Sequence, residues 1–266
     1  MHYETILFEI EKRVATITLN RPERMNAWND SMDSELQHAL RHCDQNDDVR
    51  SVVVTGSGKA FCAGADLGGG GSTFEARPAD VASDAFHPWD LCKPVIAALN
   101  GHAVGVGITF AMGCDCRYVA EDAKISFAFV RRGVIPGFAS HVTVARVVGL
   151  SNAADLMLSG RTIRGREAAA LGLATQALPA EEVLPAAMAL ARDIAENAAP
   201  ASVAITKRLL WEGATLAASE MKRREDRLFA WLGSQPDARE GVEAFLERRA
   251  PRWSMSPRRD LPDWND

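Results

Sequence analysis

The sequence predicts an α/β fold with a parallel sheet, and two kinds of segment lead to this prediction. Short apolar runs typical of strands occur at residues 14–19, 51–55, 94–99 and 125–129. Stretches with helical spacing of apolar residues separate them and dominate the chain after Arg166, where we find no convincing strand. Strands that alternate with helices favour parallel crossover connections.

The first elements have clear local signals. Val14–Leu19 alternates apolar and polar residues, as a half-buried strand does. Asn29 and its two successors are good helix N-caps, and Met32, Leu36 and Leu40 follow on one helical face. The β-branched run at 51–55 ends at a glycine and indicates a fully buried strand.

The later elements are mostly helical. Four glycines, Gly68–Gly71, begin a polar stretch that reaches about Asp84 and predicts a mobile surface loop. Amphipathic helices are expected at 181–197, 215–232 and 238–249, and an extended tail at 251–266. We expect a core domain at 1–198 and a C-terminal helical region at 199–266.

Composition and charge exclude several classes of function. The chain has 266 residues, 47% apolar and 24% charged, ordinary values for a soluble globular protein. A net charge of −5 gives no electrostatic reason to expect a nucleic acid or an anionic membrane as partner. Early acidic residues, the lack of any run of eighteen apolar residues and an odd set of five cysteines predict a cytoplasmic protein with reduced thiols.

Three common site motifs are absent. Gly56–Lys59 resembles the end of a phosphate-binding loop, but Val53 replaces the leading glycine and Ala60 the magnesium-binding hydroxyl. The third glycine of a dinucleotide-binding turn is missing at Phe110, and no serine-hydrolase elbow occurs. No cysteine or histidine spacing predicts a metal site.

Two strand-to-turn segments carry the functional argument. Residues 54–67 run from a buried strand into a turn of small residues, and residues 93–107 run from a strand into a second glycine-rich turn. Small residues let a ligand approach the main-chain amides closely. A helix is expected at 108–114, and the amino end of a helix suits an oxyanion.

These segments together resemble the crotonase (enoyl-CoA hydratase/isomerase) superfamily over nearly the whole chain. The matching motifs occur in the family's order at 17–27, 61–67, 94–107, 133–137, 156–161, 168–173 and 240–249. The resemblance implies a crotonase-like spiral of ββα units followed by a helical C-terminal oligomerisation region. It also implies a homotrimer, or a hexamer formed as a dimer of trimers.

The resemblance further implies an acyl-CoA thioester as substrate and no permanently bound cofactor. The main-chain N–H groups of Ala65 and Val106 match the two donors that hold the thioester oxygen while an enolate forms. Fixed donors of this kind act where charge develops. The positions that match coenzyme A contacts are Arg24, Ala63, Asp66 and Leu67, with Phe245 and Arg248 from the C-terminal helix of a neighbouring subunit.

The pattern departs from a standard hydratase at both catalytic glutamates. Such enzymes use two glutamates to place water and move protons. Thr109 and Phe129 occupy the matching positions here, so ordinary hydration of an enoyl-CoA is doubtful. Isomerases of the family keep the second glutamate, and the aspartate of other members aligns near Gly137.

Three functional hypotheses remain open at this point. The first is an acyl-CoA enzyme with altered acid and base groups, and the second is a non-catalytic acyl-CoA binder or assembly partner. The third is a hydrolase that uses His141, or an acid from the loop at 68–84, as its base. His141 lies one helical turn after Gly137 and titrates near neutral pH, although a surface histidine is the commoner explanation. Asp66 is expected to cap the segment that follows it.

Overall fold

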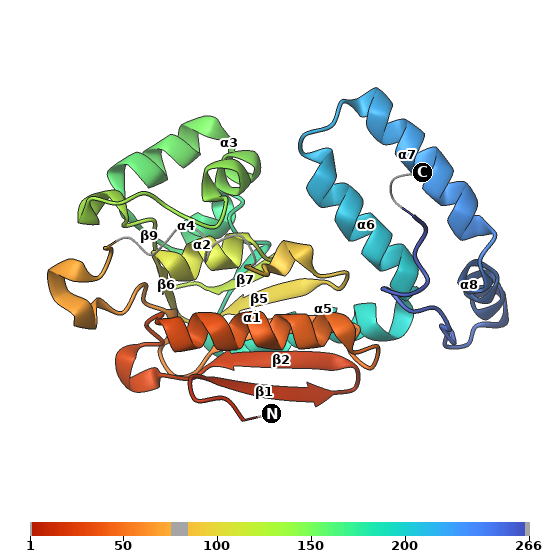
Figure 1. The fold of residues 1–266 in the computed structure, drawn as a ribbon, viewed down its shortest axis with the longest axis horizontal. Helices are drawn as coiled ribbons and strands as arrows, with labels where there is room; N and C mark the ends of the chain where they lie inside the picture. The colour runs from red at the N-terminus through yellow and green to blue at the C-terminus, as the bar shows by residue number, and fades with distance from the viewer. Residues whose placement is uncertain (1, 76–84, 264–266) are drawn as a thin grey trace.

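Two β-sheets organise the computed structural model, which describes residues 2–75 and 85–263 (Figure 1). In the six-stranded sheet, β1 and β2 pair antiparallel and all other neighbours pair in parallel. Its strands, in spatial order, are β1 (Ile6–Glu11), β2 (Val14–Leu19), β3 (Ser51–Gly56), β5 (Val95–Leu99), β7 (Cys116–Ala120) and β10 (Gln176–Leu178). The four-stranded sheet consists of β4 (Ala60–Cys62), β6 (His102–Val104), β8 (Lys124–Ser126) and β9 (Thr162–Arg164).

The strands form a repeating unit that winds through both sheets. The pairs β3–β4, β5–β6 and β7–β8 each place their first strand in the larger sheet and their second strand in the smaller one. Helices α1 (Asp30–Gln45), α2 (Val106–Met112) and α3 (Ser140–Ser159) follow the strand pairs β1–β2, β5–β6 and β7–β8. This arrangement confirms the predicted spiral of ββα units.

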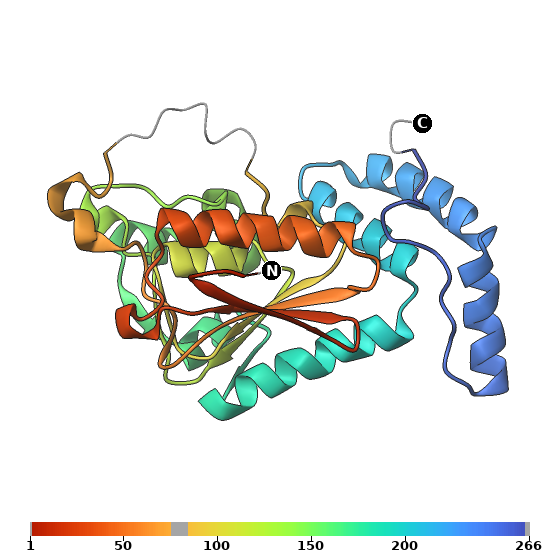
Figure 2. The same cartoon turned by 60° about the horizontal axis from the view of Figure 1, so that its bottom comes forward.

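The larger sheet is covered on both faces. Helix α5 (Ala180–Asn197) contacts β2, β3, β5 and β7, and α1 contacts β1 and β2. Figure 2 shows α1 above the strands and α5 below them. Because β3 lies between these layers, all six of its residues are buried. Each fully buried valine in such a strand contributes about 1.5–3 kcal/mol relative to an exposed one.

Two strand predictions were wrong. The strand expected at 125–129 ends earlier, because β8 stops at Ser126 and the amide of Phe129 bonds back to the carbonyl of Phe127 at 2.9 Å. The expectation of no strand after Arg166 also fails, because β10 adds to the sheet beside β7. A strand of three residues is too short to show a period in the sequence.

The glycine run forms more local structure than expected. Leu67–Ser72 is a short 3₁₀ helix, η2, with a kink at Gly70, and its residues lie at the surface. Residues 76–84 of the predicted loop lie outside the described part of the chain. Three shorter turns of 3₁₀ helix are η1 (Pro22–Arg24), η4 (Pro88–Asp90) and η5 (Val130–Arg132).

The C-terminal region is more helical than predicted. After α4 (Gly165–Ala170) and α5 come α6 (Pro200–Gly213), α7 (Ala218–Gly233) and α8 (Pro236–Glu247). Helix α6 is not among the three helices expected there, because Pro200 separates two of them, whereas it occupies the first turn of α6, where proline is favoured. Residues 251–255 are extended, and a turn follows at 257–260.

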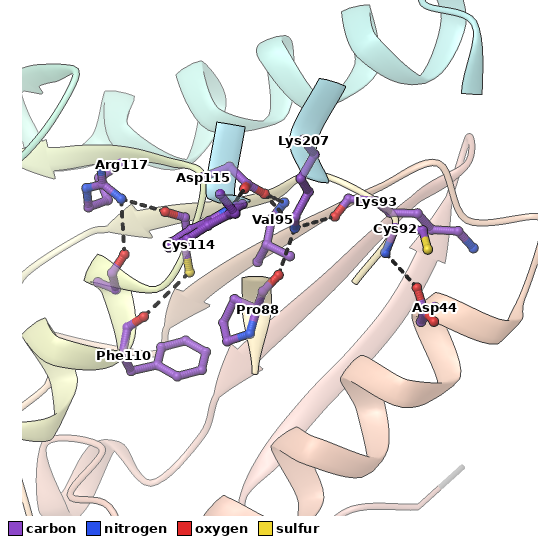
Figure 3. A network of polar contacts seen from close by, with 12 residues as sticks. Asp44, Pro88, Cys92, Lys93, Val95, Phe110, Cys114, Asp115, Arg117 and Lys207 are labelled. Carbon is purple, nitrogen blue, oxygen red and sulfur yellow. Dashed lines mark hydrogen bonds and ion pairs between the residues drawn. The ribbon is translucent and has the colours of Figure 1, made fainter. Parts of the chain in front are cut away.

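A partly buried aspartate attaches α6 to the core (Figure 3). Asp115 Oδ2 accepts hydrogen bonds from the Val95 amide at 2.7 Å and from Lys207 Nζ at 2.8 Å. Its other oxygen, Oδ1, accepts from Trp211 Nε1 at 2.7 Å. Lys207, whose side chain is only 6% exposed, also donates to two main-chain carbonyls. The carboxylate therefore joins the start of β5 to two side chains of α6.

The turns that follow β4 and β6 lie against each other because these strands pair in parallel. A Cβ atom at Gly107 would lie 2.5 Å from the Cys62 carbonyl oxygen, and one at Gly105 would lie 3.6 Å from Gly64 Cα. One at Gly64 would lie 3.3 Å from the Val104 carbonyl oxygen. At Gly107 only glycine permits this approach without displacing main chain, and at Gly64 and Gly105 the φ values of 107° and 56° also favour glycine.

Replacing Lys207 by Met should lower the free energy of unfolding by about 3 kcal/mol, because it leaves a largely buried carboxylate without its partner. Urea denaturation measures this loss. Lys222→Met is the matched control, since Lys222 pairs with Asp226 where both side chains are more than half exposed. The control should change stability by less than about 0.5 kcal/mol. Equal losses in both variants would contradict the attachment through Asp115.

Replacing Gly107 by Ala should lower stability by about 1–3 kcal/mol, because the added methyl group overlaps the Cys62 carbonyl. Gly137→Ala is the control, since a Cβ there meets no described atom within 4 Å and its φ is not positive. Thermal unfolding of both variants tests the close approach of the turns. A Gly107→Ala protein as stable as Gly137→Ala would disprove it.

Candidate active site

A cleft of about 930 Å³ opens where the turns after β4 and β6 meet. Such a volume is in the range of small-molecule sites in proteins. Its walls come from the two turns, the start of α1, the η2 segment and the loop at 128–135. Six of the predicted site residues line it, namely Ala63, Ala65, Asp66, Leu67, Val106 and Phe129.

The direction of the Ala65 amide follows from how the neighbouring main chain pairs. The Trp28 amide donates to the Gly64 carbonyl and the Asp66 amide donates to the Trp28 carbonyl, both at 2.8 Å. Successive groups along an extended chain point to opposite sides. The N–H of Ala65 therefore points away from the main chain of Trp28, and Ala65 lines the cleft.

The amide of Val106 is at the amino end of α2. Gly105 is the N-cap, with φ of 56°, and its carbonyl accepts from the Thr109 amide at 3.2 Å. Val106 itself does not have a positive φ, so its β-branched side chain causes no backbone strain. The first N–H groups of a helix have no partner within it. Val106 thus offers an unstrained donor beside the first turn.

Thr109 and Phe129, expected from the resemblance to occupy the positions of two glutamates, have different environments. Thr109 is fully buried, its hydroxyl donates to the Val106 carbonyl at 3.3 Å, and it is not among the described residues that line the cleft. Phe129 does line the cleft, and its ring is 4.0 Å from where a Cβ of Gly105 would be. Neither side chain can move a proton near neutral pH.

His141 does not share the site, contrary to the geometry that helical spacing suggested. Phe138 and Ala139 have φ of 54° and 50°, so the chain between Gly137 and His141 is not a continuous helix. His141 is exposed on the first turn of α3, and the described part of the cleft wall does not include it. The titratable side chains on that wall are those of Asp30, Asp33, Asp66, Glu75 and Arg132.

Asp66 has the capping role expected for it. Its side chain accepts from the Gly68 amide at 3.1 Å and forms an ion pair with Arg21 at 2.8 Å. The hydrogen bond from Arg21, followed by that from Gly68, lowers the pKa of this carboxyl. Arg24 is exposed on η1 and its positive charge lowers the same pKa. Asp66 therefore stays ionised and holds the first turn in place.

Cys62 is not a nucleophile despite its place beside the first turn. It is fully buried in β4, and burial raises the pKa of its thiol to about 12. The thiolate is the reactive form of cysteine. Its population near neutral pH is therefore negligible.

The two expected contacts on the C-terminal helix lie far from this cleft. Phe245 is on α8 with 81% of its surface exposed, and Arg248 ends that helix with φ of 55°. Figure 1 shows α8 on one side of the molecule and residues 67–72, drawn in orange, on the other. Within one chain, neither side chain reaches the cleft.

Two residues that shape the site, Asn26 and Trp28, are not predicted from the sequence. Asn26 is buried with φ of 56°, and its side chain donates to the carbonyls of Ser57 and Ala60 at 2.9 and 2.8 Å. Trp28 lines the cleft and donates from Nε1 to Asp33 Oδ1 at 3.1 Å. Asparagine adopts the left-handed conformation more readily than most residues, so Asn26 was a candidate for it. Its hydrogen-bond partners, however, lie more than thirty residues away in the sequence.

Within residues 2–75 and 85–263 the structure contains neither a metal-binding cluster nor a membrane-spanning helix. There, no group of three or more His, Cys, Asp or Glu side chains is arranged to hold a metal ion. No helix in those ranges is both long and apolar enough to span a membrane.

Comparisons with known proteins agree over almost the full length. The Enoyl-CoA hydratase/isomerase family profile matches residues 9–256. A probable enoyl-CoA hydratase of Mycobacterium bovis is 37% identical over 96% of this chain and 99% of its own length. The 1,2-epoxyphenylacetyl-CoA isomerase of Escherichia coli is 34% identical over 94% of this chain and 98% of its own.

A solved structure shows the same fold. The crystal structure of a probable enoyl-CoA hydratase/isomerase from Mycobacterium abscessus matches with a TM-score of 0.88 and 38% identity. The match covers 94% of this chain and 99% of that one. The chain therefore belongs to the enoyl-CoA hydratase/isomerase family of enzymes, within the crotonase superfamily.

Proposed function

We propose that this enzyme binds an acyl-CoA thioester and stabilises its enolate with the amides of Ala65 and Val106. The observation that carries the proposal is that both residues line one cleft, at turns that only glycine allows to meet. Loss of a proton from the acyl Cα moves negative charge onto the thioester oxygen. A fixed N–H donor at such an oxygen contributes about 3–4 kcal/mol to the transition state in related chemistry.

The reaction we propose is not ordinary enoyl-CoA hydration. Thr109 and Phe129 cannot activate water, and the E. coli relative is named as an isomerase that acts on a CoA thioester. The carboxylates on the described cleft wall include Asp30 on α1 and Glu75 after η2. Their presence favours an enzyme over a non-catalytic binder, which needs no titratable group there.

A hydrolase that uses His141 has less support. The exposed position of His141 outside the cleft wall disfavours it, whereas Glu75 keeps an acid from the loop at 68–84 as an alternative base. We propose no permanently bound cofactor, because coenzyme A arrives with the substrate.

We also propose that the region 199–266 joins subunits into a homotrimer or a dimer of trimers. Apolar side chains that a monomer would expose to water favour burial against another chain. On α6, α7 and α8 these are Leu210, Phe229, Val242, Phe245 and Leu246. Such contacts would bring Phe245 and Arg248 of one subunit toward the coenzyme A of another.

Calorimetry should show binding of butyryl-CoA, while hydration of crotonyl-CoA should be at least about 10²-fold slower than in a family hydratase with both glutamates. The two glutamates supply the acid and base catalysis that Thr109 and Phe129 cannot. Hydration within tenfold of that control would contradict the proposed reaction class. Failure of any acyl-CoA to bind would contradict the site.

Val106→Pro should slow exchange of the acyl Cα hydrogens with deuterated water by about 10²–10³-fold, because it removes one oxyanion donor. Proline is favoured at the first position of a helix, so α2 should remain intact. Val106→Ala, which keeps the N–H, is the control and should exchange within a few-fold of the unmodified enzyme. Equal rates in both variants, measured by NMR, would rule out this donor.

A further inference from the structure

A second cavity lies beside the cleft and shares one wall with it. It has a volume of about 90 Å³ and lies between α1, η4 and α2. Trp28 and Asp33 line both this cavity and the cleft. The Trp28 side chain therefore separates the two spaces.

The position of the Trp28 ring is fixed by several contacts. Its Nε1 donates to Asp33 Oδ1 at 3.1 Å, and Asp33 Oδ2 accepts from Gln37 Nε2 at 2.8 Å. Its ring centroid is 5.3 Å from that of Phe110 and 5.9 Å from that of Phe138. Its main chain pairs with Ala65, so the ring has a set distance from the proposed thioester site.

The second cavity suits a hydrocarbon chain. Leu36, Leu40, Phe110 and Phe138 form much of its lining. The polar groups around it are already engaged. Gln37 Oε1 accepts from the Phe86 amide at 3.2 Å, and His87 stacks on Trp89 and pairs with Asp90 at 3.3 Å.

We propose that Trp28 determines acyl-chain length by closing the cleft off from this second cavity. The inference rests on the proposed acyl-CoA function and names the substrates that the site accepts. Acyl groups that end at the indole ring fit, and longer ones meet it. The space of about 90 Å³ equals about three water molecules in the liquid, enough for about three more chain carbons.

Asp33 acts in this arrangement as a positioning residue. Its carboxylate holds the indole N–H from the first turn of α1 and is itself held by Gln37. Without that acceptor, the ring can rotate away from the boundary between the two spaces.

Trp28→Ala should move the preferred chain length of bound saturated acyl-CoA up by about three carbons or more. The test is calorimetry with a series from acetyl-CoA to decanoyl-CoA. For the longest chains that the unmodified protein disfavours, the variant should bind at least about tenfold more tightly, since each added methylene becomes buried. Trp28→Leu should give a smaller shift in the same direction and keeps an apolar wall if the alanine variant folds poorly.

Phe74→Ala is the matched control, because Phe74 lines the cleft but not the second cavity, and it should leave the preferred length unchanged. Asp33→Ala should broaden the length preference, and Asp33→Asn, which keeps an acceptor, should restore it. The same optimum in the unmodified, Trp28→Ala and Trp28→Leu proteins would overturn the role of Trp28 alone. Absence of binding for every chain length to the unmodified protein would overturn the proposed function and this inference together.

Discussion

The parallel pairing of β4 with β6 is the constraint on which the site depends. Two strands of three residues each place their turns at one edge, and the absence of side chains at Gly64, Gly105 and Gly107 lets those turns touch. Asn26 donates hydrogen bonds to main-chain carbonyls between β3 and the start of β4, and Asp66, paired with Arg21, caps the segment after β4. The positions of the main-chain N–H groups around the cleft therefore depend on the fold and not on particular side chains.

This arrangement separates two tasks that the family usually combines. The donors proposed for a thioester oxygen are main-chain N–H groups, which do not depend on the side chains at positions 65 and 106. Proton transfer depends on side chains. At the positions expected to match the two glutamates, this chain has Thr109, whose hydroxyl bonds to main chain, and the ring of Phe129. The carboxylates that remain near the cleft come from α1 and from the end of η2, a different side of the site.

The sequence was most informative where a local signal coincided with a site. Glycine-rich turns after apolar runs located Ala65 and Val106, because the carboxyl ends of parallel strands meet in any such fold. It was least informative where the partner lies far away in the chain. The pairing of Trp28 with Ala65, the addition of β10 beside β7 and the left-handed residues before His141 all depend on tertiary contacts. Pro200 gave no clear indication of α6, because proline is found both after the end of a helix and in its first turn.

A crystal structure with a bound, unreactive acyl-CoA tests the central claim most directly. The thioester oxygen should lie about 2.7–3.1 Å from the amide nitrogens of both Ala65 and Val106, the range in which such donors act. The acyl chain should then point toward the Trp28 ring. A thioester oxygen that contacts only one of these amides, or a ligand bound outside this cleft, would contradict the account.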